Sequence, residues 1–585
     1  MKLIKYMLLG IFLSALSVAE AQTVITAASC NTSDVQKAIN TATQGSTVSI
    51  PAGTCAWTSG VTIAGKGITV TGAGTSRIIA ISSTTLSLAT GAKSLTITGT
   101  NVSSPTPSIT AGQTLTIAEL GNEGNYMTGT VTSYSSSTGA LVMNITSDGG
   151  TCGNISVSNC SRWLVINTPA STTQIINDNS SDTPLFSITE DTSIDTTLGN
   201  FWVNGGTGLV HVVHINYASG GKAVVLHDLR IHENPNATEP PSGDASMIES
   251  DSNRGLIYNA SFDSDPYNIS TLFGVTIKDD GNVTGTSWKS PSNMGSLDTT
   301  GQGEFFIESS DFHAMGFGTN NDDNGRMVTR YNLYNNSGIM GTHGADTSNF
   351  GQRYFEAYNN VAVFNAYSNG TTLNLNDWFF LRGGTYVIYN NTIPAFTSQD
   401  YGSKPDINMT VMNLQRNGGP NPCWGQNTSN GAEFHAPRQV GMGYVTGNGS
   451  ANDPAVGVSS SSSDSITYVG DSEPGYIWGN TRSPLSATIS DYGGSNCSNP
   501  DTSTNYIVQG RDYFNGSTVK PGWAPYTYPH PLRSGTSTST PTPAPPVNAQ
   551  GVVQTTTTTT TTTKTTAKPA TKSTTTQPAT PKNPQ

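Results

Sequence analysis

Residues 33–74 read SDVQKAINTATQGSTVSIPAGTCAWTSGVTIAGKGITVTGAG, and the period of the apolar residues changes within this stretch. From Val35 onward, apolar residues first recur at i, i+3, i+4 and i+7, the spacing of one face of a helix. Ser33 is a suitable N-cap and Gly45 a suitable stop. The pattern therefore predicts an amphipathic helix over 33–45.

Beyond the predicted helix, apolar and polar residues alternate. The segments TVSIP, GVTIAG, GITVTG and SLTITG each place two apolar residues on one face, and glycines separate the segments. No helical segment lies between them to cover a flat parallel sheet. We therefore expect short, half-buried strands; the apolar pairs are Val48 and Ile50, Val61 and Ile63, Ile68 and Val70, and Leu95 and Ile97.

Later segments repeat one strand motif at unequal spacing. They are LIYNASF at 256–262, FIESSDF at 306–312, TRYNLYNN at 329–336, FEAYNNVAV at 355–363 and VIYNNTI at 387–393. Variable loops around a common strand predict a solenoid. Asparagine is expected where the chain turns through a left-handed backbone conformation, and its side chain can bond to the neighbouring rungs.

The opening stretch resembles the start of the pectate-lyase-like right-handed parallel β-helix proteins. The phrases PRQVGMG, GYIWGN, GRDYF and PYTYPHPL resemble the close of uncharacterised secreted bacterial members. The resemblance implies an all-β, right-handed parallel β-helix over about 30–100 and 169–410, with a helix capping its first coil. GNYMTGTVTSYSSSTGAL resembles a small β-module of phage tail and surface proteins, which suggests an insertion.

These observations divide the chain into five parts. Residues 1–21 read as a secretory signal peptide, cleaved after Ala21. We expect the cap and first coils at 22–100, the inserted module at 101–168 and the remaining β-helix with its closing segment at 169–534. Residues 535–585 are rich in Thr, Pro and Lys, and this composition predicts a disordered tail.

Charge and cysteine content restrict the partners and the compartment. A net charge of −12 with no basic run argues against nucleic acid, and no other segment reaches membrane-spanning length. We expect a secreted or cell-surface monomer whose partner is an extracellular polysaccharide. Six cysteines in an exported chain favour disulfides, and although many connectivities exist, sequence order suggests Cys30–Cys55, Cys152–Cys160 and Cys423–Cys497.

The densest group of candidate functional residues lies between 320 and 385. β-Elimination from a uronate needs a base and a cation that neutralises the carboxylate. His343 suits the base, and Arg330 and Arg382 suit the carboxylate. Glu356 completes the candidate catalytic set, and Asp322 and Asp323 form a weak Ca²⁺ candidate. The candidate substrate-binding residues are Arg326, Arg353, Asp346 and Trp378.

Other interpretations of the same residues stay open. Asp322-Asp323 followed by His343-Gly344 weakly resembles two motifs of β-helix polygalacturonases, but the NTD and RIK motifs of that family are missing. The classical aspartate run of pectate lyases is also absent. Cleavage of an acidic glycan by β-elimination is the preferred function; hydrolysis, and a non-catalytic carbohydrate-binding or adhesive role, are the alternatives. His211, His214, His227 and His232 are expected to form structural hydrogen bonds.

Overall fold

The computed structural model describes residues 23–152, 160–181, 183–206, 211–233, 245–265, 272–278, 301, 303–322, 325–342, 352–364, 378–394, 409–413, 440–441, 473–482, 485, 487–491 and 509–534. The expected helix is present as α1 (Thr32–Thr41), which buries Val35, Ala38 and Ile39. Asn31 rather than Ser33 precedes its first turn, and the chain becomes extended at Ala42. The helix ends before the expected residue 45 because the chain turns there into the first coil.

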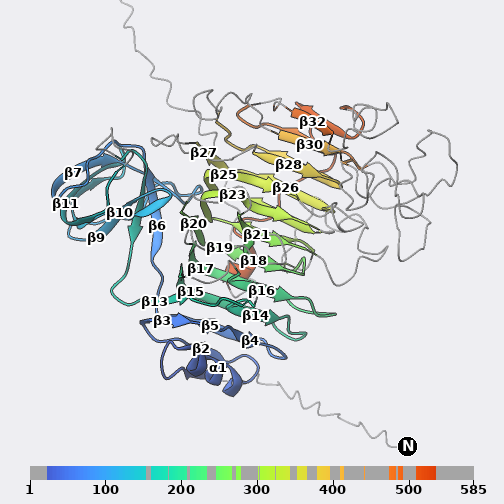
Figure 1. Cartoon of the computed structure of the whole chain (residues 1–585). Coiled ribbons are helices and arrows are strands. Elements are labelled where there is room, and N and C mark those ends of the chain that lie inside the picture. Colours follow the sequence, from blue (N-terminus) through green and yellow to red (C-terminus); the bar gives the residue numbers. More distant parts are fainter. Residues whose placement is uncertain are drawn as a thin grey trace, which may run out of the picture. The chain divides into compact units, whose positions relative to one another are not determined.

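The remaining architecture is a parallel β-helix, in which the strands form three parallel columns. Successive turns of the chain add rungs to these columns, so neighbouring strands within a column come from successive coils. Figure 1 shows these rungs following one another in chain order, from β2 and β4 beside α1 to β30 and β32. The predicted fold class is thereby confirmed.

The strands of the three columns are as follows. The first column contains β1 (Val24–Thr26), β2 (Thr47–Ser49), β5 (Thr69–Thr71), the first halves of β15 (Thr196–Gly205) and β17 (Val224–Glu233), β19 (Gly255–Tyr258), β22 (Phe305–Glu308), β24 (Arg326–Arg330), β26 (Tyr354–Tyr358), β29 (Thr385–Tyr389), β31 (Gly475–Trp478) and β33 (Tyr513–Gly516). The second contains β3 (Gly53–Trp57), β13 (Thr173–Asn177), the second halves of β15 and β17, β20 (Ser261–Ser264), the first halves of β23 (Asp311–Asn321) and β25 (Leu333–Gly341), and β27 (Val361–Val363). The third contains β4 (Val61–Ile63), β14 (Phe186–Thr189), β16 (Val213–Asn216), β18 (Ala245–Ser250), β21 (Leu272–Ile277), the second halves of β23 and β25, β28 (Phe379–Arg382), β30 (Met409–Asn413) and β32 (Ala487–Asp491).

Asparagine shapes the corner between the first and second columns, as predicted. Asn359 and Asn390 adopt positive φ angles of 58° and 51°. The residue after each is buried and bonds to neighbouring rungs. The Asn360 backbone N–H donates to Asn391 Oδ1 on the next rung at 3.1 Å, and the Asn360 Nδ2 donates to the Thr329 carbonyl on the preceding rung at 3.0 Å. A ladder of amide side chains therefore replaces the backbone bonds that the corner would otherwise lose.

The sequence Tyr-Asn-Asn occurs at 334–336, 358–360 and 389–391, and the first of these triplets is not structurally equivalent to the later two. Tyr334 lies in the second column beside Ala362, whereas Tyr358 lies in the first column beside Arg330. The true repeat therefore aligns Tyr331-Asn332 with Asn359-Asn360. The mismatch arises because β25 follows its corner directly, and sequence similarity cannot distinguish two columns with the same alternation.

A separate antiparallel sheet interrupts the second coil. Its order is β7 (Gly91–Thr96), β11 (Ala140–Gly149), β10 (Asn122–Ser135), β9 (Thr114–Glu119), β12 (Trp163–Asn167), β6 (Arg77–Ser82) and β8 (Thr98–Gly99). This sheet, here called the module, begins at Arg77, before the expected boundary at residue 101. Leu95 does not form a rung of the solenoid: it pairs antiparallel with Leu141, because a hairpin strand has the same alternation as a solenoid strand.

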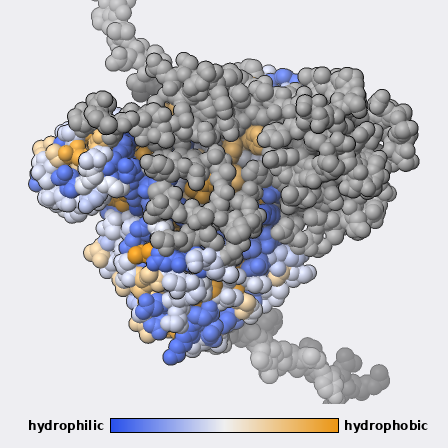
Figure 2. Space-filling view, in the orientation of Figure 1, coloured by the Kyte–Doolittle hydropathy of each residue, from blue (hydrophilic) through white to orange (hydrophobic). Residues whose placement is uncertain are grey.

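Two disulfides confirm the pairing suggested by sequence order for the four cysteines in the described residues. Cys30 is bonded to Cys55 and Cys152 to Cys160, while the expected Cys423–Cys497 pair lies outside the described residues. The predicted signal peptide and the Thr-rich tail also lie outside the described residues. No helix within the described ranges is long and apolar enough to cross a membrane. The described surface in Figure 2 is mostly hydrophilic, with small scattered apolar areas.

Candidate functional site on the third column

Two rows of polar side chains run across four neighbouring rungs of the third column. The first row is His214, Glu249, Thr276 and Asn320, which are in register from β16 to β23. The second row is Asn216, Asp251, Lys278 and Asp322, each two residues further along its segment. Because side chains alternate along a strand, both rows belong to the outward parity, and neighbouring rungs are about 4.8 Å apart.

Backbone hydrogen bonds hold the second row in line beyond the strand ends. The Asp251 N–H donates to the Ile215 carbonyl at 2.9 Å, and the Lys278 N–H donates to the Ser250 carbonyl at 2.6 Å. The Asp322 N–H continues the series to the Ile277 carbonyl at 2.8 Å. Asp251, Lys278 and Asp322 therefore place an anion, a cation and an anion on successive rungs, and the last of the three is buried.

The two rows are connected by diagonal ion pairs. His214 Nε2 lies 2.8 Å from Asp251 Oδ2, and Lys278 Nζ lies 2.7 Å from Glu249 Oε1. The four side chains retain 17–22% of their exposure, so solvent reaches them. Burial lowers the pKa of His214, but the hydrogen bond and charge of Asp251, aided by Glu249, outweigh burial and raise that pKa above its ordinary value.

Arg330, predicted to bind a substrate carboxylate, is fully buried under the closing segment 509–534. Its Nε donates to Glu308 at 2.9 Å, and its Nη1 donates to the Tyr358 hydroxyl and the Tyr526 carbonyl, both at 2.9 Å. Its Nη2 donates to the Thr527 carbonyl at 2.8 Å. In this arrangement Arg330 fastens the closing segment to the first column.

Three further candidates from the sequence are also enclosed. Glu356 accepts from the Trp523 indole N–H at 3.0 Å, and burial raises the pKa of its carboxyl. Arg353 pairs with Glu473 at 2.6 Å, and Trp378 has no exposed surface. These contacts place all three inside the protein, so their roles toward a substrate stay predictions.

The other predicted residues have different positions. Arg326 is partly exposed at the start of β24, and Arg382 ends β28, where its backbone alone is described. Asp322 is 5% exposed and belongs to the second row. His343, Asp346 and Asp323 lie outside the described residues. Their assignments stay predictions.

From the sequence alone, His214 was expected to be structural, and no role was predicted for its neighbours Glu249, Asp251 and Lys278 on the third column. A shared pattern was nevertheless present. Four strand ends each place polar residues at positions i and i+2: HIN at 214–216, ESD at 249–251, TIK at 276–278 and NND at 320–322. Detecting it required the register between segments separated by unequal loops. Only the fold supplies that register.

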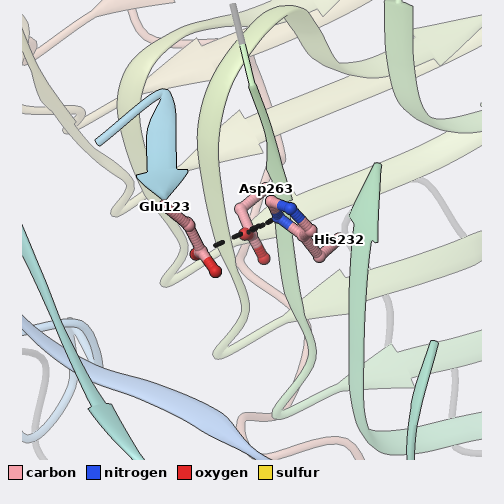
Figure 3. A group of neighbouring side chains, drawn as sticks. All are labelled: Glu123, His232 and Asp263. Atoms are coloured by element: carbon pink, nitrogen blue, oxygen red, sulfur yellow. Dashed lines mark hydrogen bonds and ion pairs between the residues drawn. The ribbon is translucent and has the colours of Figure 1, made fainter. Parts of the chain in front are cut away.

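A second charged cluster lies between the module and the second column. Glu123 comes from β10, His232 from β17 and Asp263 from β20, and Figure 3 shows their side chains converging. Arg230 donates to Asp263 from Nε at 3.0 Å and from Nη2 at 2.9 Å, and Nη2 also donates to Glu123. Because the Arg230 guanidinium binds both carboxylates, this cluster, here called the buried ion-pair cluster, links the module to the β-helix.

Burial and neighbouring charges shift the pKa values of Glu123 and His232 in this cluster. Desolvation raises the pKa of Glu123 to about 7, although the charges of Arg230 and His232 oppose the rise. Desolvation lowers the pKa of His232, but the charges of Glu123 and Asp263 outweigh it and raise that pKa to about 9. His232 Nδ1 lies 2.6 Å from Asp263 Oδ2, in agreement with a charged pair.

His227 forms a separate pair: its Nδ1 lies 2.8 Å from Asp228 Oδ2, which fits the structural role expected for His227.

Comparison with known proteins gives no family. No protein-family model matches the chain, and no curated protein matches it. Among solved structures, the tailspike of Pseudomonas phage phi297 is 12% identical, with 67% of this chain and 74% of that chain covered and a TM-score of 0.16. A complex of XylC with xylose is 8% identical, with 66% and 81% covered and a TM-score of 0.24. The tailspike of Pseudomonas phage LKA1 is 11% identical, with 66% of each chain covered and a TM-score of 0.19. Scores this low carry no argument, and the fold assignment rests on the parallel pairings above.

Proposed function

We propose that this chain acts on an acidic extracellular polysaccharide, which it binds along the two rows of the third column. The observation that carries the proposal is a group of four ionisable side chains on three successive rungs, each 17–22% exposed: His214, Glu249, Asp251 and Lys278. A regular flank of this kind suits an extended polymer, because equivalent positions repeat along it. The disulfides fit a protein of an oxidising compartment.

Cleavage by β-elimination is the proposed reaction. A base removes the proton beside the uronate carboxylate, a carbon–carbon double bond forms, and the glycosidic oxygen leaves with a proton from an acid. Lys278 is the cation proposed to bind the substrate carboxylate, because its side chain is 20% exposed on the same surface as His214. His343 remains the proposed base, and His214 is an imidazole on the described part of that flank.

The test is turnover of defined polysaccharides by the full secreted chain. We expect both ultraviolet absorbance of unsaturated ends and new reducing ends, and a large loss of both in Lys278→Met with the fold retained. Reducing ends without absorbance would replace elimination by hydrolysis. Retention on a glycan column without any product would instead favour a carbohydrate-binding or adhesive protein. His343→Ala and His214→Ala, compared side by side, identify the imidazole that matters, and a chelator arm tests Ca²⁺.

A further inference from the structure

We propose that His214, Glu249 and Asp251 form a binding site for a divalent transition-metal ion such as Zn²⁺. Each residue offers one ligand atom, and these atoms lie within 4.8 Å of one another. They come from two neighbouring rungs, β16 and β18 with its following residue, so the sheet itself fixes their spacing. The site lies on the same surface as the proposed polysaccharide-binding rows, but its test is metal binding and not turnover.

The geometry requires a small adjustment of side chains and none of the backbone. Zinc binds nitrogen and carboxylate oxygen at about 2.0–2.2 Å, so ligand atoms on one ion lie roughly 3–4 Å apart. The His214 and Asp251 atoms already lie 2.8 Å apart. Glu249 is partly exposed and has the longest side chain of the three, so it can complete the site by rotation.

The ligand types select the class of metal. Imidazole suits zinc and other transition metals, whereas Ca²⁺ takes oxygen ligands. Three protein ligands on a partly exposed surface leave a position for water or for another ligand, as in open zinc sites. His211 is a second imidazole nearby, with its ring centroid 5.3 Å from that of His214.

Lys278 is the competitor of the ion. Its ammonium lies 2.7 Å from Glu249 Oε1, where it neutralises one of the proposed ligands. A bound ion would displace this ammonium and would replace the His214–Asp251 hydrogen bond with two metal bonds. Removal of the Lys278 charge is therefore expected to strengthen metal binding, a result that a purely structural ion pair would not give.

The buried cluster of Figure 3 is the contrasting case. Glu123, His232 and Asp263 also offer three atoms within 4.8 Å, but Arg230 binds both carboxylates there. An ion would have to displace a guanidinium that is 1% exposed. We therefore place the metal on the third column.

The experiment is isothermal titration of the full, untagged chain with Zn²⁺, Mn²⁺ and Ca²⁺ at one pH. We expect one Zn²⁺ per chain to be lost in His214→Ala. Glu249→Gln, which keeps the side-chain shape, should weaken binding by at least about 10- to 100-fold, the effect of changing a residue that only orients a metal ligand. Lys278→Met should bind more tightly than the native chain. His227→Ala removes a histidine with an aspartate at the same 2.8 Å and should leave binding unchanged.

Two results would overturn the proposal. One is Zn²⁺ binding that His214→Ala and Glu249→Gln leave intact. The other is a loss in His227→Ala as large as the loss in His214→Ala, which would mean non-specific binding. Because the readout is stoichiometry and affinity, the result is independent of any failure to cleave a polysaccharide.

Discussion

Replacing Arg330 by methionine is expected to destabilise the protein and to release its closing segment. Methionine keeps much of the length of the side chain but removes the charge and all its donors. Glu308 would keep Arg533 at 3.2 Å and the His530 N–H at 2.9 Å, so its carboxylate would not be left alone. The carbonyls of Tyr526 and Thr527 would lose their donor inside the protein.

The magnitude follows from these losses. A buried acceptor left without its donor costs about 1–3 kcal/mol, and breaking a buried ion pair by removing one partner costs about 3–5 kcal/mol. Since Glu308 keeps other partners, we expect a loss of about 3–5 kcal/mol in the free energy of unfolding rather than the sum of all terms. Arg77→Met is the control: its pair with Asp228 is 3.4 Å long and about 30% exposed, so it should change stability by less than about 1 kcal/mol.

Two measurements check the Arg330 prediction. Urea unfolding followed by tryptophan fluorescence reports the closing segment, because the Trp523 ring centroid lies 5.2 Å from those of Tyr389 and Trp478. Limited proteolysis should cut within 509–534 in Arg330→Met before the rest of the chain. A variant that unfolds like the native protein yet fails to bind or cleave a polysaccharide would refute this reasoning. Arg330 would then act on the substrate, as its sequence pattern suggested.

Three further predictions concern stability. The contribution of His232 should be complete below about pH 6.5 and be lost as pH rises through about 9, because its pKa is raised in the folded protein; His232→Gln should flatten this part of a pH series of urea midpoints. Asn360→Ala should cost about 2–6 kcal/mol in the same assay, since the buried Asn332 N–H and Thr329 carbonyl both lose a partner, and a cost near zero would contradict the structural role of the ladder. Opening the Cys30–Cys55 bond by double substitution to serine should cost about 3.5 kcal/mol, because the bond closes a loop of 25 residues, and an unchanged thermal midpoint would count against that estimate.

Local sequence patterns determined the class of the fold and much of its detail. The helical spacing from Val35 and the alternation from Val48 onward are properties of neighbouring residues, so they predicted α1 and the strands without any knowledge of contacts. The pairing of Cys30 with Cys55 also followed from their order. Asn359 and Asn390 were readable as corner residues because a left-handed turn favours asparagine whatever surrounds it.

Tertiary structure decided which of the polar residues meet and which are enclosed. Leu95 joined the module, Arg330 was buried by a segment nearly two hundred residues later in the chain, and His214 met Asp251 across 37 residues. These outcomes depend on register between rungs and on the course of long connections. An alternating strand looks the same in every column and in a hairpin, so the local sequence does not encode its partner; only the stacking of the coils selects it.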